Sequence, residues 1–165
     1  MIEALLVKRA QRGDVGAFVE LIEKHKTALY KAAKSYLGSE EDIADAMQDT
    51  LLASYEHIGE LKNTSYFKTW LTRILINQCK DILRQKKRYI LSDQVEETVY
   101  EMPENDREFY ELVKELPEDY RMIFLLYYGE GFKTNEIAQI LDVNENTVKS
   151  RLRRGRDKLR QVLCY

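Results

Sequence analysis

The sequence predicts an all-α protein built from two small helical domains, and three observations support this prediction. Only 2 of the 165 residues are proline and 7 are glycine, so few residues interrupt helices. Apolar residues recur at the three- and four-residue spacing of amphipathic helices, and no segment alternates as a strand does. A chain of 165 residues suits one large domain or two small ones.

Between the first two predicted helices lie a glycine that ends the first and an aspartate that caps the second. The first covers residues 2–12 and ends at Gly13, after which Asp14 is expected to accept hydrogen bonds from the unpaired amides that open the second. The second helix ends near Leu37, before Gly38. Its predicted apolar stripe consists of Val15, Phe18, Val19, Ile22, Leu29, Ala33 and Tyr36.

Two further helices complete the N-terminal domain. Ser39 is expected to cap a helix over residues 40–58, with Asp42 at its third position in a start that resembles a capping box. A polar loop, residues 59–65, precedes a fourth helix over residues 66–88. The third helix is expected to bury Ile43, Met47, Leu51 and Tyr55, and the fourth Phe67, Trp70, Leu71, Ile74, Leu75, Ile82 and Leu83.

The net charge of −2 averages three blocks of different sign. Residues 1–89 hold 15 basic and 12 acidic side chains, residues 90–119 hold 2 and 11, and residues 120–165 hold 9 and 5, so the blocks carry +3, −9 and +4. Residues 90–106 lack a helical period and are predicted to be an acidic linker between domains 1–89 and 107–165. Charge alone leaves open whether this linker is a solvated tether or a mimic of nucleic acid.

The C-terminal domain contains a predicted helix-turn-helix. A helix over residues 106–115 precedes Pro117, which suits the start of the next helix. Thr134 is then expected to cap a short helix, and the turn DVNEN leads to a second helix from about Thr147. Small Ala138 is placed where two crossing helices touch, as in a helix-turn-helix.

The second helix of this motif is strongly basic. Its N-terminal turns are expected to lie deepest in a major groove, where Lys149, Arg153 and Arg154 could donate to guanine and Ser150 to either base type. Arg151, Arg156 and Lys158 are expected to meet phosphates, which position the helix without specifying sequence. The alternative is a solvated bundle helix, but between Thr147 and Leu163 only Asp157 could pair with these cations.

Other function classes find little support. Cys79 and Cys164 lack CxxC spacing, and with His25 and His57 they do not form a metal-ligand set. No nucleophile–base pair or phosphate-binding glycine loop is visible, so we expect neither an enzyme nor a cofactor or metal. The start of the chain does not read as a signal peptide and no stretch of 18 apolar residues occurs, so a cytoplasmic location is expected.

The C-terminal motif resembles region 4 of bacterial sigma factors, over LPEDYRMIFLLYYGEGFKTNEIAQILDVNENTVKSRLRRGRDKL. The N-terminal block resembles their region 2, and no region 3 lies between them. This organisation is similar to the extracytoplasmic-function group of the sigma-70 family. Many relatives have glycine where this chain has Asp142, but aspartate tolerates the left-handed backbone better than most residues.

The resemblance implies a transcription initiation factor with three binding surfaces. The D-x-x-Q-[ED] segment implies contact with the polymerase β′ clamp helices, and region 4 implies a partner at the β flap. The implied core-polymerase residues are Asp42, Asp45, Gln48 and Asp49. The implied minus-35 DNA residues are Thr147, Lys149, Ser150, Arg151, Arg153, Arg154 and Arg156.

The third surface would read and melt the minus-10 element. The pattern F-x-x-W-L-x-x-I-x-x-N-x-x-x-D-x-x-R begins at Phe67, and Trp70 within it is expected to be largely packing. The preceding loop corresponds to the family's base-capturing loop, with Leu61 and Tyr66 as the wall against which a flipped base stacks. The implied minus-10 residues are Leu61, Lys62, Asn63, Thr64, Tyr66, Asn77, Lys80, Arg84 and Arg88.

The resemblance also implies partners and regulation. An anti-sigma factor, membrane-anchored in many relatives, is the expected regulatory partner, and the acidic linker would thread the polymerase channels as an RNA mimic. Two alternatives remain open. One is a helix-turn-helix regulator that is not a sigma subunit, and the other is a decoy that only occupies polymerase or another protein.

Overall fold

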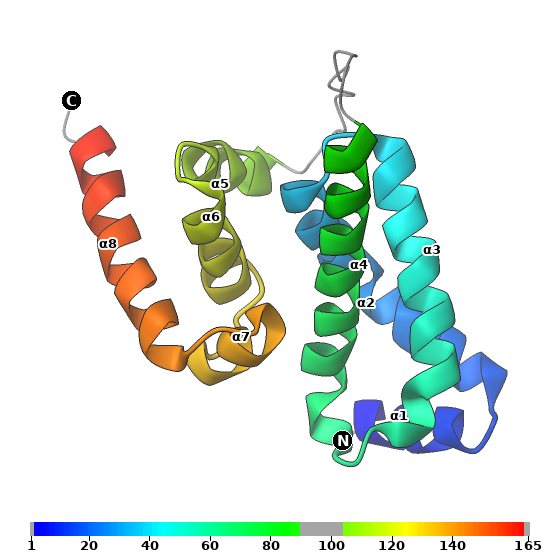
Figure 1. The fold of residues 1–165 in the computed structure, drawn as a ribbon. Coiled ribbons are helices and arrows are strands. Elements are labelled where there is room, and N and C mark those ends of the chain that lie inside the picture. The colour runs from blue at the N-terminus through cyan, green and yellow to red at the C-terminus, as the bar shows by residue number, and fades with distance from the viewer. Residues whose placement is uncertain (1, 90–103, 164–165) are drawn as a thin grey trace. The chain divides into compact units, whose positions relative to one another are not determined.

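The computed structural model describes residues 2–89 and 104–163, which form two compact units (Figure 1). The described residues contain helices and no strand, which confirms the predicted all-α fold. Almost the whole predicted linker, residues 90–103, lies outside the described residues. Its last three positions, 104–106, are already helical.

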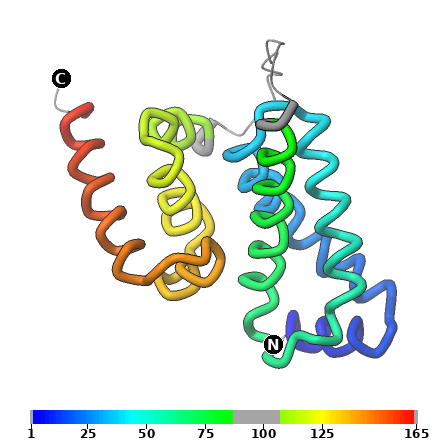
Figure 2. Tube along the Cα trace, in the orientation of Figure 1, coloured from blue at the N-terminus to red at the C-terminus, as the bar shows by residue number. Residues whose placement is uncertain are grey.

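The first unit is a helical bundle. Figure 2 traces α3 and α4 running antiparallel alongside each other, while α1 crosses the end at which α2 begins. Two short 3₁₀ turns, η1 and η2, replace the loop that was expected between α3 and α4. The elements are α1 (Ile2–Gln11), α2 (Val15–Tyr36), α3 (Glu40–His57), η1 (Ile58–Glu60), η2 (Thr64–Tyr66) and α4 (Phe67–Tyr89).

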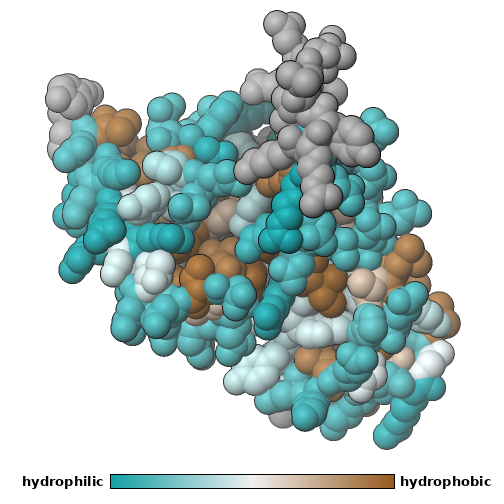
Figure 3. Space-filling view, viewed as in Figure 1, coloured by the Kyte–Doolittle hydropathy of each residue, from teal (hydrophilic) through white to brown (hydrophobic). Residues whose placement is uncertain are grey.

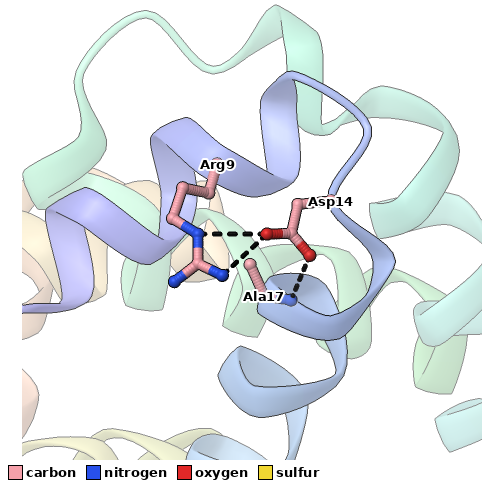
Figure 4. Close-up of polar contacts among 3 residues, drawn as sticks. All are labelled: Arg9, Asp14 and Ala17. Carbon is pink, nitrogen blue, oxygen red and sulfur yellow. Dashed lines mark hydrogen bonds and ion pairs between the residues drawn. The ribbon is translucent and has the colours of Figure 1, made fainter.

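Local caps start α2 and α3 as predicted. Asp14 Oδ1 accepts a hydrogen bond from Ala17 N at 3.1 Å, and Arg9 donates to Asp14 Oδ2 from Nε at 3.0 Å and Nη2 at 2.7 Å (Figure 4). The bond from Ala17 N, aided by Arg9, lowers the pKa of Asp14. The cap therefore stabilises the fold at pH values above the ordinary pKa of an aspartate carboxyl group. This contribution is lost as the pH falls through the lowered pKa of Asp14. Ser39 Oγ similarly accepts from Asp42 N at 3.2 Å.

The face that α3 buries differs from the predicted one. Leu51 and Tyr55 are 41% and 50% exposed, whereas Thr50 and Ser54 are buried. The two hydroxyls can be buried because each donates to its own helix, Thr50 Oγ1 to Ala46 O at 2.7 Å and Ser54 Oγ to Leu51 O at 3.0 Å. The prediction is confirmed for Ile43, which is buried, and for Met47, which packs against the core, and it is wrong for Leu51 and Tyr55.

The predicted stripe of α2 is also only partly buried. Val15 and Val19 are about half exposed, although Phe18 between them is buried. The ring of Phe18 meets that of Tyr55 edge-on, with 5.2 Å between the ring centroids. Figure 3 shows brown hydrophobic patches on a face that is otherwise mostly hydrophilic. The buried residues of α2 also include the small side chains of Ala17, Ala32 and Ala33.

The core of the first unit is centred on α4. Phe67, Leu71, Leu75 and Cys79 are fully buried on one face, and burial raises the pKa of the Cys79 thiol to about 12. Trp70 is half-buried and packs against this core with its ring centroid 5.9 Å from that of Phe67, as expected for a packing residue.

The second unit contains the helix-turn-helix. Thr134 is the first residue of α7 and not, as was predicted, its N-cap. The N-cap is Lys133, whose backbone N donates to Glu136 Oε2 at 2.8 Å. Thr134 Oγ1 instead donates to Glu145 at 2.9 Å and so connects α7 to the start of α8. The elements are α5 (Glu104–Lys114), α6 (Glu118–Phe124), the π-helical turn η3 (Leu125–Gly129), α7 (Thr134–Leu141) and α8 (Glu145–Leu163).

The turn between α7 and α8 has the expected left-handed residue. Asp142 has φ 54° and ψ 50°, and Val143 N donates to Ala138 O at 3.0 Å. Helix α8 begins at Glu145, two residues earlier than predicted. Asn144 accounts for the shift, because its Oδ1 accepts from Asn146 N at 2.9 Å.

One close helix contact in this unit was not predicted. Gly155 lies on the buried face of α8, and a Cβ there would stand 2.3 Å from Cε2 of Phe124. Because Phe124 is itself buried on α6, only glycine lets α8 approach α6 this closely.

Candidate polymerase and nucleic-acid interfaces

The outer face of α8 carries the predicted DNA-reading residues. Lys149, Arg153 and Arg154 are exposed, while Thr147, Ser150 and Arg151 are partly buried. Lys149 Nζ lies 3.6 Å from Glu145 Oε1 and forms an ion pair with it. Arg153 and Arg154 form no ion pair with any described residue. The opposite face, with Val148, Leu152 and Gly155, is buried. Helix α8 therefore presents to solvent two guanidinium groups that lack an ion-pair partner among the described residues.

Arg156 has partners that its position in the sequence did not indicate. Its Nε donates to the Tyr128 hydroxyl at 2.6 Å, and its guanidinium carbon lies 6.0 and 5.7 Å from the ring centroids of Tyr127 and Tyr128. Lys158 similarly lies 4.7 Å from the ring centroid of Tyr120. Arg156 therefore helps to hold α8 against η3, and Lys158 helps to hold it against α6.

The predicted base-capturing loop is well ordered by its own contacts. Leu61 is partly buried and packs against the core, so within the predicted wall Tyr66, at 47% exposed, offers the more accessible surface. Asn63 Oδ1 accepts from Ser65 N at 3.0 Å and from Ser65 Oγ at 2.6 Å. Lys62 is exposed and Thr64 is partly buried.

The same loop continues into a polar face of α4. Asn77 and Arg84 are exposed and Lys80 is partly buried, at spacings that put all three on one side of the helix. Arg84 also faces Asp81 at 3.4 Å, an exposed pair that a nucleic acid could replace at little cost. Arg88 belongs to the last turn of α4, and its side chain lies outside the described residues.

The acidic stripe on α3 is divided in two by an internal ion pair. Asp42 pairs with Lys86 of α4, and its side chain is only 16% exposed. Asp45, Gln48 and Asp49 remain exposed on the outer face of α3, where Leu52 is 54% exposed beside them. The surface available to a partner therefore starts at Asp45 and combines carboxylates with an apolar residue.

Candidate metal sites and membrane-spanning helices are both absent from residues 2–89 and 104–163. No three described His, Cys, Asp or Glu side chains are grouped so that they could hold a metal ion. None of the described helices combines the length and the apolar character that crossing a membrane requires.

The chain matches two protein families, "Sigma-70 region 2" over residues 21–89 and "Sigma-70, region 4" over residues 94–159. It is 33% identical over 141 positions to the RNA polymerase sigma factor SigV of Bacillus subtilis, covering 83% of this chain and 85% of SigV. It is 30% identical over 176 aligned positions to the ECF RNA polymerase sigma factor SigW of the same organism, covering 95% of this chain and 94% of SigW.

Solved structures agree with these sequence matches. CnrH in complex with the cytosolic domain of CnrY gives a TM-score of 0.73 at 25% identity, covering 99% of this chain and 97% of CnrH. The sigma factor RpoE in complex with the anti-sigma factor NepR, from Bartonella quintana, gives 0.74 at 25% identity, covering 88% and 96%. This chain therefore belongs to the extracytoplasmic-function group of the sigma-70 family and is an RNA polymerase sigma factor.

Proposed function

We propose that this sigma factor works by binding and strand capture, with a separate surface for each target. Region 2, residues 1–89, binds core polymerase through α3 and the minus-10 element through the loop and polar face of α4. Region 4, residues 107–165, binds the minus-35 element through α8, and residues 90–106 connect the two. The observation that supports this most directly is the exposed pair Arg153 and Arg154 on the face of α8 opposite its buried side, neither of which has an ion-pair partner within residues 2–89 and 104–163.

The role of α8 follows from the geometry of a major groove. The groove is about 12 Å wide and admits one helix, whose outward side chains can then reach base edges. Arg153 and Arg154 are free to donate two hydrogen bonds each to guanine O6 and N7, with Lys149 and Ser150 one turn earlier. Thr147, Arg151 and Arg156 are assigned to the DNA backbone, Arg156 with its guanidinium held by Tyr128.

The minus-10 surface is assigned to one continuous strip. A base flipped out of the duplex needs a stacking surface and polar partners. Tyr66 supplies exposed aromatic surface, Leu61 supplies a partly buried apolar side chain, and Lys62, Asn63 and Thr64 supply polar groups. Asn77, Lys80, Arg84 and Arg88 then follow the strand along α4.

Core polymerase and an anti-sigma factor are the proposed protein partners. The relatives CnrH and RpoE were solved with the cytosolic domain of CnrY and with the anti-sigma factor NepR, which supports a similar inhibitor here. The exposed acidic stripe suits the β′ clamp helices, and region 4 is assigned to the β flap. This proposal places the chain in the cytoplasm, held at the membrane only through its inhibitor, and assigns it no catalytic step.

Reconstitution with core polymerase tests the proposal as a whole. The full chain and core enzyme should start transcription from a subset of a promoter library that shares minus-35 and minus-10 sequences. A regulator that is not a sigma subunit would bind DNA but would not support initiation by core polymerase. A decoy would bind polymerase and yield no promoter-dependent transcript.

Substitution of the arginine pair should change minus-35 recognition. Arg153→Ala or Arg154→Ala should cost about 1–3 kcal/mol of binding and relax the preference for guanine at one position. Transcription from promoters that vary at each minus-35 position measures this. Arg160→Ala is the matched control, because Arg160 is exposed two turns away and faces Asp157 at 3.9 Å. An unchanged preference in both test variants would contradict the placement of α8.

Charge reversal on the acidic stripe should weaken polymerase binding. Asp49→Lys puts a cation where the proposal places a basic partner surface, so affinity for core polymerase should fall by about tenfold or more. Titration of labelled chain with core enzyme measures this. Glu23→Lys makes the same change in net charge at an exposed site on α2 and should have little effect. Equal affinities for the two variants would count against this surface.

A further inference from the structure

Gln11, the last residue of α1, holds the backbone that leads into the base-capturing loop. Its Nε2 donates to Ile58 O at 2.9 Å and to Leu61 O at 2.8 Å, across 47 and 50 residues of sequence. Both carbonyls belong to the connection between α3 and α4. Gln11 lies outside the residues that match the sigma-70 region 2 family, which begin at residue 21.

The two bonds constrain this connection more than either would alone. A primary amide has two hydrogens on its nitrogen, and Gln11 uses one for each carbonyl. Ile58 O also accepts from Leu61 N at 3.2 Å, so the turn η1 is closed internally and attached to α1 at both ends. Gln11 is partly buried, which limits competition from water.

The attached segment ends where base capture is proposed to begin. Leu61 is the first residue of the loop, and the contacts of Asn63 with Ser65 order its next part. Tyr66 then follows as the last residue of η2. The loop is therefore held at its entry by Gln11 and in its middle by Asn63, before α4 begins at Phe67.

We propose that Gln11 is a positioning residue for recognition of the minus-10 strand. It does not contact DNA, but it holds the loop in the conformation that receives a flipped base. This inference rests on the proposed function of residues 61–66 in base capture. A loop that is ordered before binding avoids the entropy cost of becoming ordered when the base is captured, which raises its affinity for the base. A small displacement of the loop reduces this gain in affinity.

A double-mutant cycle between protein and DNA tests this role. Full chain with core polymerase is bound to fork-junction DNA that presents the minus-10 non-template strand as a single strand. An abasic scan with the unchanged protein first identifies the position at which removal of the base weakens binding most. Binding of Gln11→Ala and Gln11→Met is then measured on intact DNA and on DNA abasic at that position.

The expected result is a loss that depends on the captured base. Both variants should bind intact DNA about tenfold more weakly than the unchanged protein does. All three proteins should bind the abasic DNA equally well, because Gln11 and the captured base are coupled only through base capture. Gln11→Met keeps the side-chain length without its donors, so it separates the hydrogen bonds from packing. Lys8→Ala, an exposed change on α1, should leave the ratio of intact to abasic binding unchanged.

Two other outcomes would overturn the inference in distinguishable ways. Equal ratios of intact to abasic binding for the unchanged protein and both Gln11 variants would show that Gln11 does not act through the captured base. A flat abasic scan with the unchanged protein would instead contradict base capture by this loop, and the role of Gln11 would fall with it.

Discussion

Phe67→Ala should remove about 3–5 kcal/mol from the stability of the first unit, the usual cost of deleting a buried aromatic ring. Phe67 is fully buried at the start of α4, and its ring centroid lies 5.7 Å from that of His25 and 5.9 Å from that of Trp70. The free energy of unfolding of such a domain is roughly 5–15 kcal/mol in total, so this substitution would remove a large part of its stability. Denaturant unfolding followed by tryptophan fluorescence measures this unit selectively, because Trp70 is the single tryptophan.

The comparison with Tyr66 makes this test informative about function. Tyr66→Ala, one residue earlier and about half exposed, should change stability little but should weaken capture of the minus-10 strand. If Phe67→Ala kept full stability and lost only promoter melting, Phe67 would be a DNA contact and not a core residue, contrary to its burial.

Gly155→Val should destabilise the second unit by about 3 kcal/mol, the upper end of the usual cost of overpacking. The first added carbon already meets Phe124 at 2.3 and 2.7 Å, and the two methyl groups of valine need further space between α6 and α8. Gly155→Ala should cost less, because alanine gains about 1 kcal/mol in helix propensity against the same contact. Far-ultraviolet circular dichroism should show one transition shifted to lower denaturant while the Trp70 signal stays unchanged.

The control for Gly155 separates packing from helix propensity. Asp157→Val introduces the same β-branched side chain at an exposed position of α8 and should cost only a few tenths of a kcal/mol, in the range of ordinary surface substitutions. Minus-35 binding by Gly155→Val should fall while affinity of the first unit for core polymerase is retained. Equal stability of Gly155→Val and Asp157→Val would show that α6 and α8 are not in the close contact described.

Features that depend on a few neighbouring residues were predictable from the sequence. The caps at Asp14 and Ser39 were confirmed because each joins a side chain to an amide three residues later. The left-handed Asp142 and the exposed basic face of α8 also follow from local chemistry and helical period. The exposed positions on α4 lie on one face for the same reason.

Features that depend on a partner far along the chain were not predictable. Thr50 and Ser54 replaced Leu51 and Tyr55 on the buried face of α3, because the apolar pattern did not show which neighbouring helix would cover it. Lys86 neutralises Asp42 within the predicted polymerase stripe, and Arg156 donates to Tyr128 across 28 residues. None of these pairs has a local signature.

The sequence by itself therefore determined the helical class, the caps, the two sigma regions and the basic face of α8, since these arise from residue types and short spacings. Only the tertiary structure decided which acidic residues of α3 stay exposed, why α8 needs glycine at position 155, and how α1 attaches to the minus-10 loop through Gln11. The physical reason is that capping and periodicity act within one or two turns of a helix, whereas ion pairs, close packing and the Gln11 bonds form only when distant segments meet.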